Sequence, residues 1–180
     1  AVMLPNVPQV VIACQAVLRI GAITVMNNPL YTEAELTKQI GDSGSSVLVT
    51  DEDGLGKALN LRRKTSIRII ITTGLNEYAS SGNEYKDQPL PSYPEVFRFS
   101  DLMGQNSSDL VADASDWDDV ANIIYTGGTT GVSKGVMLTH ANLSCNVQQY
   151  SVWMYDTIDG QESWPLVYPI FHSAGYTMQN

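Results

Sequence analysis

The sequence predicts an α/β fold in which βαβ units form a mainly parallel sheet. Short apolar runs rich in β-branched residues recur at Ala22–Met26, Ser46–Thr50 and Ile67–Thr73. The stretches between them have the apolar spacing and the capping residues that are typical of helices. Strands of this length that alternate with helices pair in parallel, because a crossover helix returns the chain to the same end of the sheet.

Helix start and stop signals alternate with these strands through residues 1–73, the βαβ region. Two sites pair a polar N-cap residue with Glu or Gln three residues later, which is the pattern of a capping box. Glycines supply the helix ends. The elements expected here are a strand end at Ala1–Leu4, a helix from an Asn6–Gln9 capping box to Gly21, a strand at Ala22–Met26, a helix from a Thr32–Glu35 capping box to Gly41 or Gly44, a strand at Ser46–Thr50, a helix at Gly54–Arg63 and a strand at Ile67–Thr73.

The rest of the chain is organised differently. Prolines and a Ser-Ser-Gly-Asn run in residues 74–98 are typical of a surface connection, and we expect connecting loops throughout residues 74–119. The elements expected next are a short helix and approach loop within Asn106–Asp119, a strand at Val120–Thr126, a glycine-rich loop, a strand at Gly135–Thr139, a helix from about Ala141 to Trp153 and a last strand at Glu162–Tyr168.

Composition narrows the classes of function. An apolar content of 43% in 180 residues fits one globular core. The net charge of −9 argues against binding nucleic acid, and it allows at most a peripheral association with a membrane. The longest apolar run, Val7–Met26, is interrupted by Gln, Arg and Gly residues, so we do not expect it to span a membrane.

Cys14 and Cys145 are the two cysteines, and both lie in apolar, helix-like surroundings. We expect buried, reduced thiols in a cytoplasmic protein, because two cysteines do not build a disulfide framework. The other residues for which we expect structural roles are His140 near a helix start and, in the core, Trp153, Met154 and Tyr155.

The segment with the clearest chemistry is the glycine loop, residues 126–135, with the sequence Thr-Gly-Gly-Thr-Thr-Gly-Val-Ser-Lys-Gly. Lys134 is the only Lys or Arg between Phe99 and Asn180, a stretch that holds nine Asp or Glu residues. Glycines let backbone N–H groups approach an anion, while hydroxyl and ammonium groups add donors. The loop therefore predicts a polyphosphate site.

Other interpretations of the loop can be compared with its spacing. It has no Gly-Lys pair as Walker A requires, and its glycines do not fit Gly-x-Gly-x-x-Gly. A β-type segment follows the loop, so a helix N-terminus is not the expected anion site. The alternative is a plain hairpin turn, in which Gly and Thr are common.

The loop resembles the signature of the adenylate-forming superfamily, which includes acyl-CoA synthetases, luciferases and peptide-synthetase adenylation domains. That pattern reads Thr-Ser/Gly-Gly-Thr-Thr-Gly-x-Pro-Lys-Gly, and this chain departs from it only at Ser133, which stands in place of Pro. Four further segments resemble fatty acyl-CoA ligases in the same order: Leu4-Pro5-Asn6, Asn28-Pro29-Leu30-Tyr31-Thr32, Leu138-Thr139-His140 and Tyr168-Pro169-Ile170-Phe171-His172.

The resemblance implies roles for individual residues. The loop would hold the β- and γ-phosphates of ATP, with Lys134 supplying charge and His172 lying beside the substrate carboxylate and the α-phosphate. Thr126 would also contact Mg²⁺. The residues implied to bind the nucleotide are Thr126, Gly127, Gly128, Thr129, Thr130, Gly131 and Lys134.

By the same resemblance, residues 1–180 are part of one N-terminal ATP- and acyl-binding domain, with the phosphate-loop region at 120–180. The adenine-binding segment and the C-terminal domain with its catalytic Lys are absent, so we expect these 180 residues alone to be inactive. The longer protein would use ATP, a fatty acid and coenzyme A. The alternatives are an aryl- or amino-acid-adenylating enzyme of the same superfamily and a non-catalytic scaffold.

Overall fold

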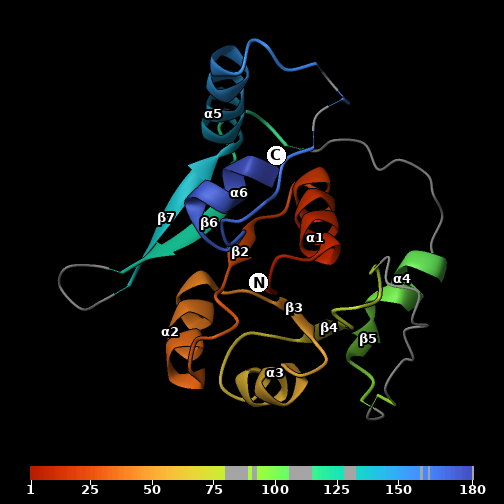
Figure 1. The fold of residues 1–180 in the computed structure, drawn as a ribbon. Coiled ribbons are helices and arrows are strands. Elements are labelled where there is room, and N and C mark those ends of the chain that lie inside the picture. Colours follow the sequence, from red (N-terminus) through yellow and green to blue (C-terminus); the bar gives the residue numbers. More distant parts are fainter. Residues whose placement is uncertain are drawn as a thin grey trace.

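A mainly parallel sheet forms the centre of the molecule (Figure 1). The structure is a computed structural model that describes residues 1–79, 89–90, 93–105, 115–127, 133–158, 160–161 and 163–179. In these residues the sheet has the order β5-β4-β3-β1-β2-β6-β7, and only the β6–β7 pair is antiparallel. The strands are β1 (Val2–Met3), β2 (Thr24–Met26), β3 (Val47–Asp51), β4 (Ile69–Thr73), β5 (Val96–Arg98), β6 (Val120–Thr126) and β7 (Lys134–Thr139).

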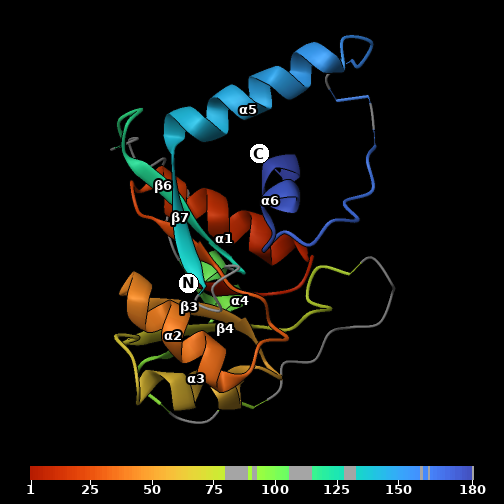
Figure 2. The same cartoon turned by 90° about the vertical axis from the view of Figure 1, so that its left-hand side faces the viewer.

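Helices cover both faces of this sheet. Figures 1 and 2 show α2 and α3 together at the opposite end of the molecule from α5. The helices are α1 (Pro8–Arg19), α2 (Glu33–Ser43), α3 (Leu55–Arg62), α4 (Phe99–Gln105), α5 (His140–Trp153) and α6 (Ser173–Gln179). The sequence prediction of a mainly parallel α/β sheet is confirmed.

Side chains that alternate along the strands divide the core into two layers. Val2 and Val49 pack with residues of α1, α4 and α6, whereas their neighbours Met3 and Leu48 pack with α2 and α3. The helices α1, α4 and α6 therefore cover one face of the sheet, and α2 and α3 cover the other.

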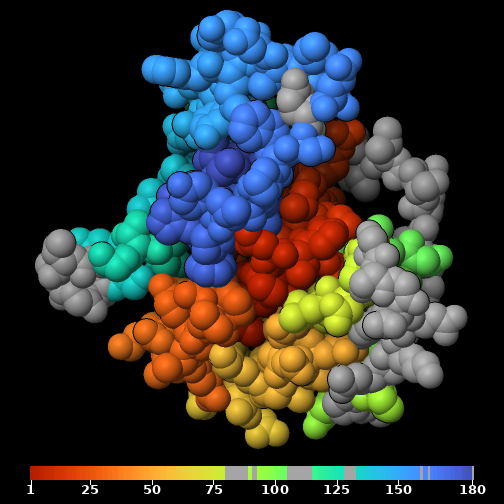
Figure 3. Space-filling view, viewed as in Figure 1, coloured from red at the N-terminus to blue at the C-terminus, as the bar shows by residue number. Residues whose placement is uncertain are grey.

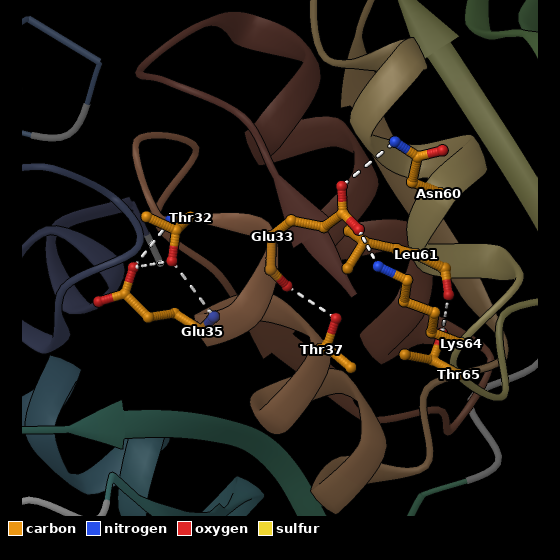
Figure 4. Close-up of polar contacts among 8 residues, drawn as sticks. All are labelled: Thr32, Glu33, Glu35, Thr37, Asn60, Leu61, Lys64 and Thr65. Carbon is orange, nitrogen blue, oxygen red and sulfur yellow. Dashed lines mark hydrogen bonds and ion pairs between the residues drawn. The ribbon is translucent and has the colours of Figure 1, made fainter.

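The second capping box and the end of its helix are confirmed. Thr32 Oγ1 accepts a hydrogen bond from Glu35 N, and the Glu35 carboxylate accepts one from Thr32 N (Figure 4). Glu33 in the first turn binds Lys64 and Asn60 of the α3 region, so α2 is tied to its neighbour. The helix ends at Gly44, whose φ of 66° is the left-handed conformation that glycine adopts at low cost.

The predicted capping box at the start of α1 is wrong. The N-cap residue is Val7, and no side chain caps the helix. The Asn6 amide instead donates to Leu166 O and Tyr168 O, distant in sequence, while buried Gln9 donates to Thr73 Oγ1 and Gly74 O. Long-range contacts thus occupy both side chains.

Four other expectations also differ from the structure. The connecting region contains β5 and α4, and residues 163–168 contain no strand. The short helix expected within Asn106–Asp119 is not tested, because only residues 115–119 of that range are described, and these contain no helix. Residues 106–114 and Glu162 lie outside the described residues. Cys14 is buried as expected, but Cys145 is exposed, as are Trp153 at 85% and Tyr155 at 82%. Among the described residues, no helix has the length and apolar character that crossing a membrane requires.

Candidate functional site

The glycine loop connects the two antiparallel strands at one edge of the sheet. Thr126 is the last residue of β6, Lys134 is the first residue of β7, and these two residues are paired across the ladder. The loop leaves the carboxyl end of β6, which runs parallel to β2. Ligands in open α/β sheets bind outside the carboxyl ends of the strands, so the loop lies where a ligand site is expected.

The predicted phosphate-binding residues fall into two groups. Thr126, Gly127 and Lys134 are exposed at the two ends of the loop. The rest of the predicted set, Gly128, Thr129, Thr130 and Gly131, lies outside the described residues. A strand rather than a helix follows the loop, in agreement with the expectation that no helix N-terminus forms the anion site.

The last glycine of the loop has a steric role. A Cβ atom on Gly135 would lie 2.9 Å from Ile123 Cγ2 and 3.2 Å from Tyr125 Cζ. Those side chains belong to β6, against which Gly135 is paired. A larger residue at this position would force the Ile123 or Tyr125 side chain to shift just behind Lys134.

Helix α2 contacts the β6 end of the loop. The Tyr125 hydroxyl donates to Asp42 Oδ2 at 2.6 Å and to Gln39 O at 3.0 Å. Burial, together with the hydrogen bond to the Asp42 carboxylate, raises the pKa of Tyr125 above its ordinary value. The phenol therefore stays protonated and keeps its donor at physiological pH. Figure 3 shows the surface of α2, in orange, beside that of the β6–β7 hairpin, in teal.

A second set of contacts closes the β7 end of the loop. Ser133 Oγ donates to Thr126 O at 3.1 Å, which bridges the loop just beyond the last strand pair. Gln39 Nε2 lies 3.5 Å from Ser133 Oγ, and Gln39 Oε1 accepts a hydrogen bond from Asn27 Nδ2 at 2.9 Å. Asn27 and Gln39 are both buried, so these contacts begin in the core.

His172 lies on a different segment, immediately before α6. Its side chain is exposed, and its Nδ1 accepts a hydrogen bond from Ala174 N at 3.3 Å. The preceding segment is held by Asn6, which follows β1: its amide donates to Leu166 O and Tyr168 O, and its Oδ1 accepts from Ile170 N. His172 is therefore placed near the same carboxyl edge of the sheet as the glycine loop.

Helix α6 packs closely against the sheet through Gly175 and Tyr176. A Cβ atom on Gly175 would lie 2.1 Å from Pro169 O, so only glycine fits there. The fully buried Tyr176 has its hydroxyl 2.9 Å from Thr24 Oγ1, and Asn122 Nδ2 donates to the same Thr24 oxygen at 2.6 Å. These contacts fix the helix that begins next to His172.

The remaining expectations concern His140 and a metal. His140 is the first residue of α5, directly after the N-cap residue Thr139, which forms a capping box with Asn142. This agrees with the helix start expected there. No group of three or more His, Cys, Asp and Glu side chains that could hold a metal ion occurs in the described part of the chain.

Sequence reasoning assigned no role to Asn6, Gln39, Asp42 or Tyr125 in shaping the site. The Thr139–Asn142 box was detectable from the Thr-x-x-Asn spacing before a helix, although Asn replaces the usual Glu or Gln. No local signal identifies Asn6, Gln39, Asp42 or Tyr125 as residues that shape the site. Their partners in the site lie 83 or more residues away along the chain.

Comparisons with known proteins cover the whole chain. A family model described as AMP-binding enzyme matches residues 1–180. The chain is 36% identical to a long-chain-fatty-acid–CoA ligase of Bacillus subtilis and 32% identical to one of Haemophilus influenzae, over 98% and 99% of its own length. It spans about a third of the length of these curated relatives, 34% in each case.

The fold of this chain also matches that of a solved structure. A long-chain-fatty-acid–CoA ligase from Archaeoglobus fulgidus matches with a TM-score of 0.74 at 29% sequence identity. The match covers 99% of this chain and 32% of that one.

Proposed function

Because this chain belongs to the AMP-binding enzyme family, we propose that the full-length protein is an AMP-forming fatty acid–CoA ligase. In this proposal ATP and a fatty acid give acyl-AMP and pyrophosphate, and the acyl group then passes to coenzyme A. Residues 1–180 form part of its N-terminal, ATP- and acyl-binding domain. The observation that carries the proposal is Lys134, exposed at the end of a glycine loop and paired with Thr126 at the carboxyl edge of the sheet.

The loop acts on the leaving group of the first step. An oxygen of the fatty-acid carboxylate attacks the α-phosphorus, and the bond to the β-phosphate oxygen breaks, so negative charge grows on pyrophosphate. The Lys134 ammonium, with the hydroxyl and N–H groups of the loop, stabilises this charge more in the transition state than in the ground state. In the second step the thiol sulfur of coenzyme A attacks the acyl carbonyl carbon, and AMP leaves.

Mg²⁺ accompanies ATP in this proposal. It commonly binds substrate phosphates and keeps several waters, so it needs few protein ligands. The exposed Thr126 hydroxyl at the strand end is the protein ligand proposed here. His172 is proposed to contact the substrate carboxylate, since its imidazole is exposed at the same edge of the sheet.

A cytoplasmic location is part of the same proposal. It is supported by Cys14 and Cys145, which are free thiols.

Substitution of Lys134 tests the function. In the full-length protein, Lys134→Ala is expected to slow pyrophosphate release by about 100-fold or more, the usual effect of losing a donor that stabilises developing charge. The matched control is Lys38→Ala, an exposed lysine on α2. An unchanged rate in Lys134→Ala would contradict the role of the loop, and no pyrophosphate release with any fatty acid would contradict the function itself.

A further inference from the structure

Helix α2 contacts both ends of the glycine loop, and this arrangement points to a role beyond packing. Tyr125 at the β6 end binds Asp42 and the Gln39 carbonyl, whereas Ser133 at the β7 end lies against the Gln39 side chain. Lys134 directly follows Ser133, and Thr126 directly follows Tyr125. The two residues expected to meet ATP are therefore each next to a residue that α2 holds.

We propose that Tyr125 and Ser133 are positioning residues through which α2 sets the spacing and direction of the loop ends for ATP. The proposal rests on the function proposed above and adds residues to the same site. Tyr125 and Ser133 act through Thr126 and Lys134, and neither is proposed to touch the nucleotide.

The Ser133 contact explains how this chain does without the proline of the resembled pattern. A proline fixes φ and reduces the freedom of the loop before ATP binds. Here the Ser133 hydroxyl bridges to Thr126 O at 3.1 Å and links the two ends directly. The same bond keeps the Thr126 carbonyl oxygen, which would repel a phosphate, directed at a donor within the protein.

The Tyr125 contact anchors the other end. Its 2.6 Å bond to Asp42 has a carboxylate acceptor, and hydrogen bonds to ionised groups are about twice as strong as neutral ones. Burial raises the pKa of Tyr125, so the phenol keeps the proton that it donates to Asp42 at physiological pH. The aromatic ring also packs beneath Gly135, as the 3.2 Å approach of a Cβ there to Tyr125 Cζ indicates.

Helix α2 is held in place at both ends and along its buried side. A capping box begins it, Gly44 ends it, and its residues Leu36 and Ile40 are fully buried. Gln39 is in turn held by Asn27, the residue that follows β2. Asn27 donates to Gln39, Gln39 donates to Ser133, and Ser133 donates to the Thr126 carbonyl. This chain of hydrogen bonds connects the loop ends to the end of β2 in the sheet.

The test compares Ser133→Ala, Ser133→Pro and Tyr125→Phe in the full-length protein. Pyrophosphate release is measured with ATP varied at saturating fatty acid, and then with fatty acid varied at saturating ATP. Ser133→Ala and Tyr125→Phe are each expected to lower kcat/KM for ATP about fivefold, the equivalent of one hydrogen bond. The KM for fatty acid should not change, and Ser133→Pro should stay within about twofold of the wild type, because proline also restricts the loop.

Matched controls separate positioning from general loss of structure. Ser66→Ala removes a comparable bond to a backbone carbonyl on the other half of the sheet, and Tyr150→Phe removes a hydroxyl on α5. A purely structural role would lower the melting temperature and the fraction of active enzyme while leaving kcat/KM for ATP, per active molecule, as in the wild type. That result would overturn the proposal, as would wild-type kinetics in both Ser133→Ala and Tyr125→Phe, or a Ser133→Pro variant as slow as Ser133→Ala.

The Lys134→Ala variant distinguishes failure of this inference from failure of the function. If Lys134→Ala is slow and the Ser133 and Tyr125 variants match the wild type, the loop binds ATP and α2 does not position it. If Lys134→Ala also matches the wild type, the proposed function fails together with the inference.

Discussion

Gly175→Ala is the substitution whose effect follows most directly from the structure. The new Cβ would lie 2.1 Å from Pro169 O, 2.5 Å from Pro169 C and 2.8 Å from Tyr168 O, whereas ordinary contacts begin at 3.4 Å. All three atoms belong to the backbone, so no side chain can rotate away. Helix α6 or the segment before it must move by about 1 Å to remove the overlap.

Two opposing effects determine how much Gly175→Ala changes the free energy of unfolding. Overpacking costs about 1–3 kcal/mol, and the better helix propensity of alanine returns up to about 1 kcal/mol. We therefore expect a net loss of roughly 1–2 kcal/mol in the free energy of unfolding. His172, which is proposed to contact the substrate, lies directly before α6, and a shift of about 1 Å in such a group can lower the rate by up to about 100-fold.

Denaturant unfolding and pyrophosphate release in the full-length protein measure these two effects. The matched control is Gly56→Ala, a glycine in α3 whose added Cβ would have no atom within 4 Å. This variant should keep full activity and gain up to about 1 kcal/mol. The steric reasoning is refuted if Gly175→Ala is as stable and as active as Gly56→Ala.

Two further predictions concern α2 and Tyr176. Thr32→Ala removes the N-cap of α2 and should lower the free energy of unfolding by about 1 kcal/mol in denaturant titrations. The control Thr37→Ala removes only a hydrogen bond to the Glu33 carbonyl within the same helix and should lower it by less. Equal losses in the two variants would contradict the role of Thr32 as a cap. Burial raises the pKa of Tyr176 above its ordinary 10.0, so the folded state favours the protonated phenol. The contribution of Tyr176 to the free energy of unfolding is therefore fully present below pH 10.0 and is lost as the pH rises further. Tyr176→Phe should therefore lose less stability than the wild type as the pH is raised above 10.0, and parallel stability curves for the two proteins would contradict this assignment.

The parallel sheet was predictable because its signals are local. Strands such as Ile69–Thr73 consist of consecutive β-favouring residues, and the Thr32–Glu35 box and Gly44 define α2 from a few neighbouring positions. The short elements were missed for the opposite reason. Strand β5 has only three residues, Val96–Arg98, and its sheet position comes from pairing with β4.

Polar residues near the chain start were misinterpreted because their partners are distant. The Asn6-x-x-Gln9 spacing satisfies the rule for a capping box, yet each amide makes stronger use of its groups elsewhere, Asn6 with residues 166–170 and Gln9 with Thr73 and Gly74. Trp153 and Tyr155 were assigned to the core as large aromatic residues, but both are exposed in the structure.

The position of the loop between two strands could be predicted from the sequence, whereas the contacts that support the loop could not. The run from Thr126 to Gly135 indicated a phosphate site with Lys134 as its cation, and the structure places the described ends of that run at the carboxyl edge of the sheet. Ser133 entered only as a departure from the resembled pattern. Its bond to the Thr126 carbonyl and its contact with Gln39 depend on how α2 packs, which no local rule describes.

The three hydrogen bonds of Asn6 affect the order in which the protein can fold during its synthesis on the ribosome. Asn6 is synthesised before its three partners, because Leu166, Tyr168 and Ile170 follow 160 to 164 positions later. At about 5–20 residues per second, the asparagine waits roughly 8–30 s for its partners. The segment that carries His172 is synthesised after the seven strands of the described sheet, so Asn6 can hold it in place only once those strands have been made.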